Sequence, residues 1–305
     1  MQRQQGKQRV SNSVELQTNF ATYDIKRMIF GKVDEPTIPG SNLTYKRINI
    51  STLYSDGSIG PLLIQTPSVF SFGLSESKDV VTKIPNGFTW PLCLHSKNGV
   101  TEEEKRWTDA FDRLLRHCKV HLVKVKELLG KAKLSVDGET LDKFSPLSYR
   151  KDGTGGPMLY TKVLTRKRSA GVLADPKSEF DKNNEISSLF TNMDTEDTMD
   201  PRSLFGKYNH SIAALKVESI YIGATSIKLQ VKLYQVQVKL LDAEIKPVIS
   251  RQRPEAQGLV VASEDGDDDL EEGSLHDSDV EDVSEVKEIK IEEKPKKKVP
   301  KKVRM

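Results

Sequence analysis

The feature that most constrains the fold of this chain is the alternating stretch LKVESIYIGATSIKLQVKLYQVQVKLL at residues 215–241. Apolar residues occupy every second position from Ile227 to Leu233, with lysines and a glutamine between them. Successive side chains of a β-strand point to opposite faces, so this pattern predicts a half-buried strand with a basic outer face. The residues 223–226, GATS, separate it from a preceding apolar run, which predicts a hairpin.

The alternation slips by one residue after Leu233, so that Tyr234, Val236, Val238 and Leu240 form the next inward-facing set. A slip of one residue would expose that whole set unless a β-bulge absorbed the extra residue. We therefore expect a bulge near Leu233 and Tyr234. Long, bulged and curved strands are typical of small closed barrels.

Further strands are expected at 43–53, 61–66, 69–74, 88–95 and 157–167, with Pro91 at a sheet edge or a bulge. Thr101 and Glu104 fit a capping box, and apolar residues then recur at steps of three and four as far as Leu129, which predicts one long helix. The order of elements predicts a mainly β (β+α) fold. We expect an OB-like small β-barrel with one long packed helix, long loop insertions and a disordered C-terminal tail.

Charge is unevenly distributed along the chain. Residues 264–293 hold 15 acidic residues and two lysines, whereas residues 294–305 hold seven basic residues and no acidic ones. Without these two stretches, the formal net charge of +3 becomes +9 on residues 1–263. We expect a flexible basic arm at 1–12, an OB-like nucleic-acid-binding domain with insertions at 13–249, and a disordered acidic-then-basic tail at 250–305. A basic folded part favours a polyanionic partner.

Several classes of protein fit the sequence poorly. Two cysteines, Cys93 and Cys118, do not make a disulfide framework and are expected to be buried thiols. The sequence contains no run of 18 apolar residues, which is the length that would predict a membrane span. His117 and His121 lack the glutamate of a metalloprotease motif, and the glycine-rich residues 153–156 lack the lysine of a P-loop. We therefore predict a protein that is not an enzyme and uses no cofactor or metal.

Binding of a single strand requires cations that neutralise phosphates and aromatic faces on which bases stack. Both kinds of residue cluster on or beside the expected strands. The candidates are Tyr45, Lys46, Arg47, Tyr149, Arg150, Tyr160, Lys162, Arg166, Arg168, Lys228 and Lys232. Each tyrosine taken singly could instead belong to the core of the barrel.

The segments PLLIQTPSVFSFG, PLCLH with the helix around RWTDAFDRLL, PMLYTKVLTRK and SIYIGATSIKLQVKLYQVQVKLL span roughly residues 43–245. This layout resembles the OB-fold single-stranded DNA-binding proteins of nucleocytoplasmic large DNA viruses, of the African swine fever virus type. The resemblance implies coating of single-stranded DNA, or RNA, without sequence preference during viral DNA replication and repair. It places the protein in the viral factories of the host cytoplasm, in the nucleus or in the virion. It also implies that DNA follows a basic face with Lys46, Arg47, Tyr160, Lys162, Arg166 and Lys228.

Two other interpretations remain open. The chain could be a virion or core protein that uses the barrel to dock proteins without nucleic-acid activity, and Tyr45 and Tyr160 would then point into the core. Alternatively, the acidic tail could make it a chaperone of basic nucleoproteins. If the chain instead binds single-stranded DNA, the acidic tail would recruit replication proteins or only keep the chain soluble.

Overall fold

A computed structural model of the chain describes residues 14–37, 43–79, 82–96, 99–150, 156–169 and 176–241. The chain divides into two units, residues 1–245 and 246–305. The expected arm at 1–12 and tail at 250–305 lie outside the described residues. The strands of the main sheet are β1 (Leu16–Gln17), β2 (Met28–Asp34), β3 (Lys46–Leu53), β4 (Ile59–Gly60), β5 (Leu62–Gln65), β6 (Val69–Ser71), β7 (Ser75–Lys78), β8 (Pro85–Cys93), β9 (Leu147–Ser148), β10 (Met158–Val163), β13 (Leu189–Asn192), β14 (Asn209–Ile222) and β15 (Ile227–Leu240). A separate pair joins β11 (Thr165–Lys167) to β12 (Asn184–Ile186), and the α-helices are α1 (Glu102–Lys124), α2 (Lys126–Leu129) and α3 (Glu179–Asn183).

The central feature of the first unit is a closed five-stranded β-barrel, which confirms the expected mainly β fold. Around the barrel, β6 pairs with β8, β8 with β10, β10 with β15, β15 with β14, and β14 with β6. The β10–β15 pair is parallel, and the other four pairs are antiparallel. In chain order the strands close as first, second, third, fifth and fourth, which gives the barrel its OB-like connectivity.

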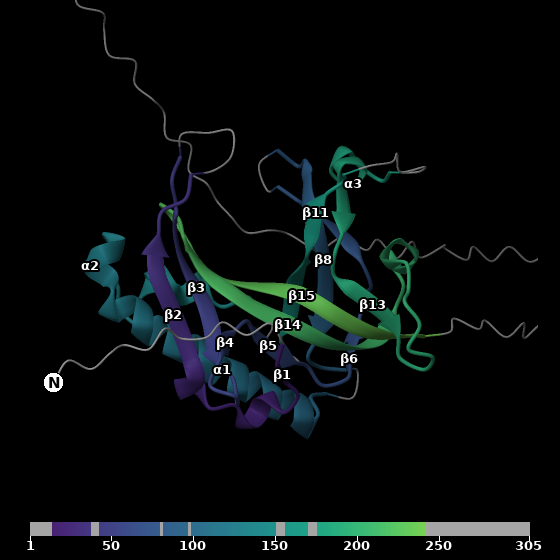
Figure 1. The fold of residues 1–305 in the computed structure, drawn as a ribbon, viewed down its shortest axis with the longest axis horizontal. Helices are drawn as coiled ribbons and strands as arrows, with labels where there is room; N and C mark the ends of the chain where they lie inside the picture. The colour runs from purple at the N-terminus through teal and green to yellow at the C-terminus, as the bar shows by residue number, and fades with distance from the viewer. Residues whose placement is uncertain are drawn as a thin grey trace, which may run out of the picture. The chain divides into compact units, whose positions relative to one another are not determined.

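The long hairpin β14–β15 forms the spine of this barrel and appears as two long curved ribbons in Figure 1. Its register shifts twice, leaving Glu218 on β14 and Tyr234 on β15 as unpaired bulge residues. The bulge expected near Tyr234 is therefore confirmed. Of the expected inward-facing set, Val236 and Val238 are fully buried, but Tyr234 and Leu240 are 38% and 42% exposed, so for these two residues the expectation is wrong. The extra residue of a bulge is pushed out of the alternation that its neighbours follow.

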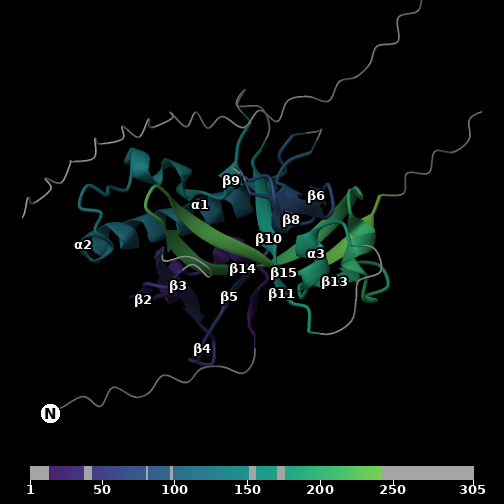
Figure 2. The ribbon, with the colours of Figure 1, turned by 90° about the horizontal axis from the view of Figure 1, so that it is seen from above.

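The helix α1 covers one side of the sheet, away from α3 and the β11–β12 pair (Figures 1 and 2). Its capping box is present, since the Thr101 hydroxyl accepts from the Glu104 N–H and the Glu104 carboxylate accepts from the Thr101 N–H. The apolar stripe from Trp107 to Leu122 is buried in the core, and the Trp107 indole donates to the carbonyl of Gln65. The expected single helix is interrupted at Val125, and α2 ends at Gly130 in the left-handed region (φ 67°).

Two expectations about strands need correction. The expected strand at 157–167 is divided, because β10 ends at Val163 and β11 pairs with β12 outside the barrel. Pro91 lies within β8, which has partners on both sides, so the expected sheet edge is wrong. The alternative of a bulge fits better, because four residues between Phe70 and Ser75 stand opposite three residues between Thr89 and Cys93. The segment opposite Pro91 lies between β6 and β7 and forms no ladder pair with it. Proline has no N–H, but at this position no hydrogen bond of the ladder requires one. Cys93 and Cys118 are free and buried, as expected.

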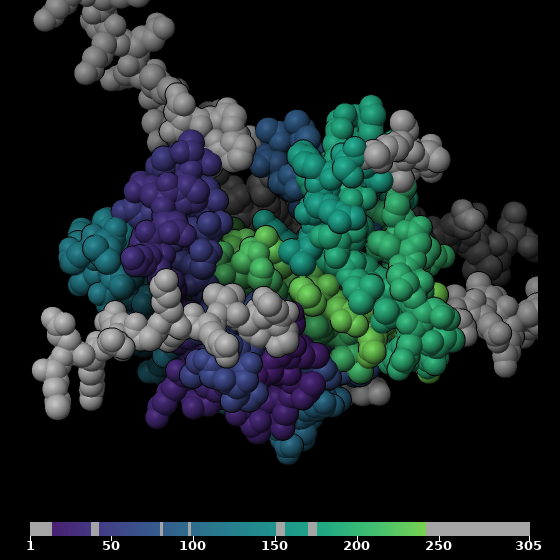
Figure 3. Space-filling model, viewed as in Figure 1, coloured from purple at the N-terminus to yellow at the C-terminus, as the bar shows by residue number. Residues whose placement is uncertain are grey.

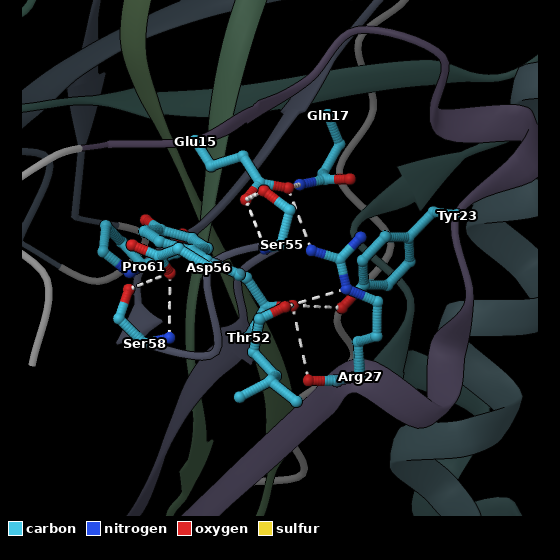
Figure 4. A network of polar contacts seen from close by, with 11 residues as sticks. Glu15, Gln17, Tyr23, Arg27, Thr52, Ser55, Asp56, Ser58 and Pro61 are labelled. Carbon is cyan, nitrogen blue, oxygen red and sulfur yellow. Dashed lines mark hydrogen bonds and ion pairs between the residues drawn. The ribbon is translucent and has the colours of Figure 1, made fainter. Parts of the chain in front are cut away.

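A polar network joins the first described residues to the β3–β4 hairpin (Figure 4). The Glu15 carboxylate accepts from the backbone N–H and hydroxyl of Ser55 and from the guanidinium of Arg27, 2.9 Å away. Partial desolvation acts to raise the pKa of Glu15, but the hydrogen bonds from Ser55, Gln17 and Arg27 lower it from 4.5 to about 2. The turn at 55–58 is thus held by a carboxylate that lies forty residues earlier in the chain.

Candidate nucleic-acid interface

The candidate site lies on the outer face of the two parallel strands β10 and β15. Leu159, Thr161 and Val163 of β10 are buried, so Tyr160 and Lys162 point outward. On β15 the residues Ile227, Leu229, Val231 and Leu233 are buried, which turns Lys228, Gln230 and Lys232 to the same outer face. Lys162 and Lys232 are directly paired in the register, so their side chains emerge next to each other. Figure 3 shows part of the β15 surface uncovered between the β2–β3 hairpin and the segment with α3 and β11.

This face is hollowed by two adjoining depressions, which we call the groove. The larger, of about 570 Å³, lies between β10, β15 and the segment 142–149, and includes Tyr149, Tyr160, Lys162 and Lys228 in its wall. The smaller, of about 320 Å³, lies between β10, β15 and the β7–β8 hairpin and includes Lys232. Lys162 and Gln230 border both depressions, which makes the groove continuous along β10 and β15.

The groove is electropositive. Desolvation lowers the pKa of Lys162 from its ordinary value, and the neighbouring charges of Lys232 and Lys228 lower it further. In the part of the chain that the structure describes, neither Lys162 nor Lys228 forms an ion pair with a carboxylate. Crowded ammonium groups without counter-charges favour an anion that enters the groove.

One carboxylate moderates this charge. Glu218, the bulge residue of β14, lies 2.6 Å from the ammonium of Lys232 and 3.3 Å from that of Lys216. Desolvation acts to raise the pKa of Glu218, but the hydrogen bonds and charges of Lys232 and Lys216 lower it overall. Lys232 is therefore largely neutralised within the fold, whereas Lys162 and Lys228 form no ion pair with a carboxylate of the described residues.

Two aromatic side chains border the larger depression. Tyr149 is 56% exposed and Tyr160 is 50% exposed, so each offers ring surface to solvent beside the cations. Desolvation raises the pKa of both phenols, and the charges of Asp112 and Asp109 act in the same direction on Tyr149. Both rings are therefore neutral near pH 7 and have faces available for stacking.

Tyr45, which directly precedes β3, and Lys46 and Arg47 on β3 lie beyond β14 from the groove. Arg47 pairs across strands with Tyr221, which pairs in turn with Lys228, so the three residues form one row on the outer face. Arg47 also lies 3.8 Å from the carboxylate of Asp34. The Tyr45 ring packs against Tyr221 with centroids 5.0 Å apart. Lys46 faces the opposite side and donates to the carbonyl of Leu128 at 2.8 Å.

The arginine candidates make contacts of their own outside the groove. Arg166 forms an ion pair with Glu185 across the β11–β12 pair. Arg168 donates to the carbonyls of Lys182 and Asn184, which fixes the end of that pair. Arg150 is exposed directly after Tyr149. The structure therefore brings Tyr149, Tyr160, Lys162, Lys228 and Lys232 together and leaves Arg166 and Arg168 apart.

Sequence reasoning missed two residues of the site. Lys143 contributes a cation to the larger depression from a 3-10 turn that had no strand or helix signal. Glu218 had a signal, because the apolar alternation of β14 slips between Val217 and Ile220 as it does on β15. That second slip marks the bulge from which Glu218 reaches the lysines.

The other motifs add no site. His117 and His121 lie against the Phe30 ring, and His121 stacks on it with centroids 3.9 Å apart. No group of three metal-ligating side chains occurs among the described residues. Most of the glycine-rich residues 153–156 lie outside the described part of the chain. In that part, no helix has the length and hydropathy needed to cross a membrane.

A family model matches residues 21–278 of the chain under the description "Protein of unknown function (DUF2738)". The chain belongs to the DUF2738 family. No curated protein matches the chain. The family match covers all five barrel strands and the groove of this DUF2738 protein, so a function must be argued from the groove itself.

Proposed function

We propose that this DUF2738 protein binds single-stranded DNA without strict sequence preference and is not an enzyme. The observation that carries the proposal is the groove, where Lys162 and Lys228 form no ion pair with a carboxylate of the described residues and lie beside two half-exposed tyrosines. Lysines on neighbouring strands can neutralise backbone phosphates, which releases the counterions of the nucleic acid and favours binding at low salt. Tyr149 and Tyr160 would stack bases, and stacking tolerates any base because each has an aromatic face.

The position of the groove on the barrel supports the same proposal. OB-folds bind oligonucleotides on the face of their second and third strands, between the loops that join strands one to two and four to five. Here the second and third strands are β8 and β10, and β10 carries Tyr160 and Lys162. The β7–β8 hairpin at the smaller depression belongs to the first of those loops. Lys228 follows the second loop, at 223–226.

The competing hypothesis of a protein-docking barrel expected Tyr45 and Tyr160 in the core. Tyr160 is 50% exposed between cations, and Tyr45 is partly buried against Tyr221. The exposed ring favours nucleic-acid binding. Together with the sequence resemblance to viral single-stranded DNA-binding proteins, this leads us to propose a role in viral DNA replication and repair.

The test is fluorescence anisotropy with a labelled oligothymidylate of about 16 nucleotides, the upper end of OB-fold site sizes. We expect Tyr160→Ala to weaken binding by about 1–3 kcal/mol, the value of one stacked base. Lys162→Ala and Lys228→Ala should each lower the slope of log K against log salt by about 0.7, the value of one phosphate contact on a single strand.

Lys105→Ala is the matched control, because Lys105 is an exposed lysine of α1 outside the groove. It should leave both affinity and salt slope unchanged. A duplex of the same length should bind more weakly than the single strand. Equal binding of duplex and single strand, or an equal loss in Lys105→Ala and Lys162→Ala, would contradict the proposal.

A further inference from the structure

A second group of exposed aromatic side chains lies on the outer face of the barrel, outside the groove. Phe70 on β6, Phe72 after it and Tyr208 before β14 contact one another, with ring centroids 5.0 to 5.7 Å apart. The rings of His210 and Phe70 lie edge to face, with centroids 6.3 Å apart. We call these four residues the aromatic patch. Phe72 is 41% exposed and Tyr208 is 59% exposed, so the patch is open to solvent.

The backbone around the patch is fixed. Gly73 has a φ of +84°, and a Cβ at this position would lie 2.4 Å from the carbonyl oxygen of Leu204. Leu74 donates to that carbonyl at 2.9 Å, and Gly206 donates to the carbonyl of Leu74 at 3.2 Å. The segment that carries Phe72 is therefore held against the segment that leads to Tyr208. A surface held in this way binds with little ordering cost.

The patch is continuous with the groove through β8. In the register, Phe70 pairs with Cys93 and Cys93 pairs with Met158, whose sulfur lies 3.9 Å from the Tyr160 hydroxyl. Cys93 is only 4% exposed, as expected for a small side chain between larger neighbours on both flanking strands. Neighbouring strands are about 4.8 Å apart, so Phe70 lies roughly 10 Å from Met158 across β8.

A cation beside the patch suits a phosphate backbone. Lys207 is exposed next to Tyr208, and the imidazole of His210 is exposed beside Phe70. Lys239, which pairs with His210 across the hairpin, is held by Asp194 at 3.0 Å and so contributes little net charge. Aromatic rings beside cations are the combination that single strands recognise.

We propose that the aromatic patch is a second stacking site for the same single strand, which runs from the groove across β8 to Phe72 and Tyr208. The inference rests on the proposed function and adds the route that the single strand takes across the barrel. Bases would stack on Tyr160 first and on the patch only when the strand is long enough to cross β8.

The experiment compares labelled oligothymidylates of about 4 and about 16 nucleotides, the two ends of OB-fold site sizes. A Phe72→Ala/Tyr208→Ala variant should bind the long probe roughly 5- to 100-fold more weakly, the range expected for loss of base stacking. Its affinity for the short probe should match that of the unaltered chain. Tyr160→Ala should weaken both probes. Thermal unfolding of each variant checks that the fold is retained.

A fluorescence measurement keeps the test valid if the double variant does not fold. Trp90 and Trp107 are 0% and 3% exposed, so Tyr208→Trp introduces an exposed tryptophan that reports on the patch. The long probe should change its emission, and the short probe should not. If the long probe binds but leaves this emission and the affinity of the double variant unaltered, the patch is a surface for another partner, such as a protein, and the inference fails. If no probe binds the unaltered chain, the proposed function itself fails.

Discussion

At the scale of single residues, the charge of the groove depends on which of its lysines pair with a carboxylate in the described part of the chain. Lys162 and Lys232 are neighbours in the register, but Glu218 neutralises only Lys232. The difference follows from the bulge on β14, which turns Glu218 toward one lysine and not the other. Glu218 therefore lowers the positive charge of the groove, whose wall also includes Asp142.

We predict that Glu218→Gln raises affinity for single-stranded DNA at low salt by about 2- to 5-fold, the value of one partly exposed charge interaction. The reason is that Lys232 and Lys216 lose their counter-charge and become available to phosphates. Anisotropy at low and high salt measures the gain, which should disappear as salt screens the charges. Glu185→Gln, which frees Arg166 outside the groove, is the control. An equal gain in both variants would show that only net charge matters.

Glu15 gives a prediction about pH. Its pKa in the folded chain is about 2, below the ordinary value of 4.5, so its stabilising effect is complete above pH 4.5 and is lost as the pH falls toward 2. Glu15→Gln should lower the free energy of unfolding by about 1–3 kcal/mol at pH 6. The difference from the unaltered chain should shrink at pH 3, as measured by urea unfolding. Glu127→Gln, at an exposed position of α2, should show neither effect.

At the scale of elements, α1 is the part that local sequence rules determine most fully. The capping box at Thr101 and Glu104 closes as the sequence predicts, and the apolar stripe packs into the core. The interruption at Val125 has no comparable local signal. After it, Lys46 and Lys131 donate to the carbonyls of Leu128 and Ala224, contacts that only the folded chain provides.

We predict that Thr101→Ala destabilises the chain by about 1 kcal/mol, because the Glu104 N–H loses the hydroxyl that accepts from it. Thr101→Ser keeps that acceptor and should remain close to the unaltered chain. Urea unfolding followed by circular dichroism measures both. If the serine variant lost as much stability as the alanine variant, the contribution would come from the threonine methyl group and not from the cap.

At the scale of the whole molecule, the barrel brings separate strands together in the face that carries the groove. β10 and β15 are more than sixty residues apart in the chain, yet they pair in parallel and place Lys162 beside Lys232. The segment 142–149 then adds Tyr149 and Lys143 as the opposite wall of the larger depression. The dependence of DNA affinity on salt concentration and on probe length would report on this assembled surface as a whole.

The sequence alone determined the alternation of β15, the bulge near Tyr234, the capped helix and the basic character of the outer strand face. These features follow from side-chain periodicity and local backbone chemistry, which act within a few residues. Tertiary structure alone decided that Tyr160 and Lys228 share a groove, that Arg166 and Arg168 are held elsewhere, and that Glu218 neutralises Lys232. Those outcomes depend on strand pairing between distant segments, and the same pattern of lysines and tyrosines is compatible with several pairings.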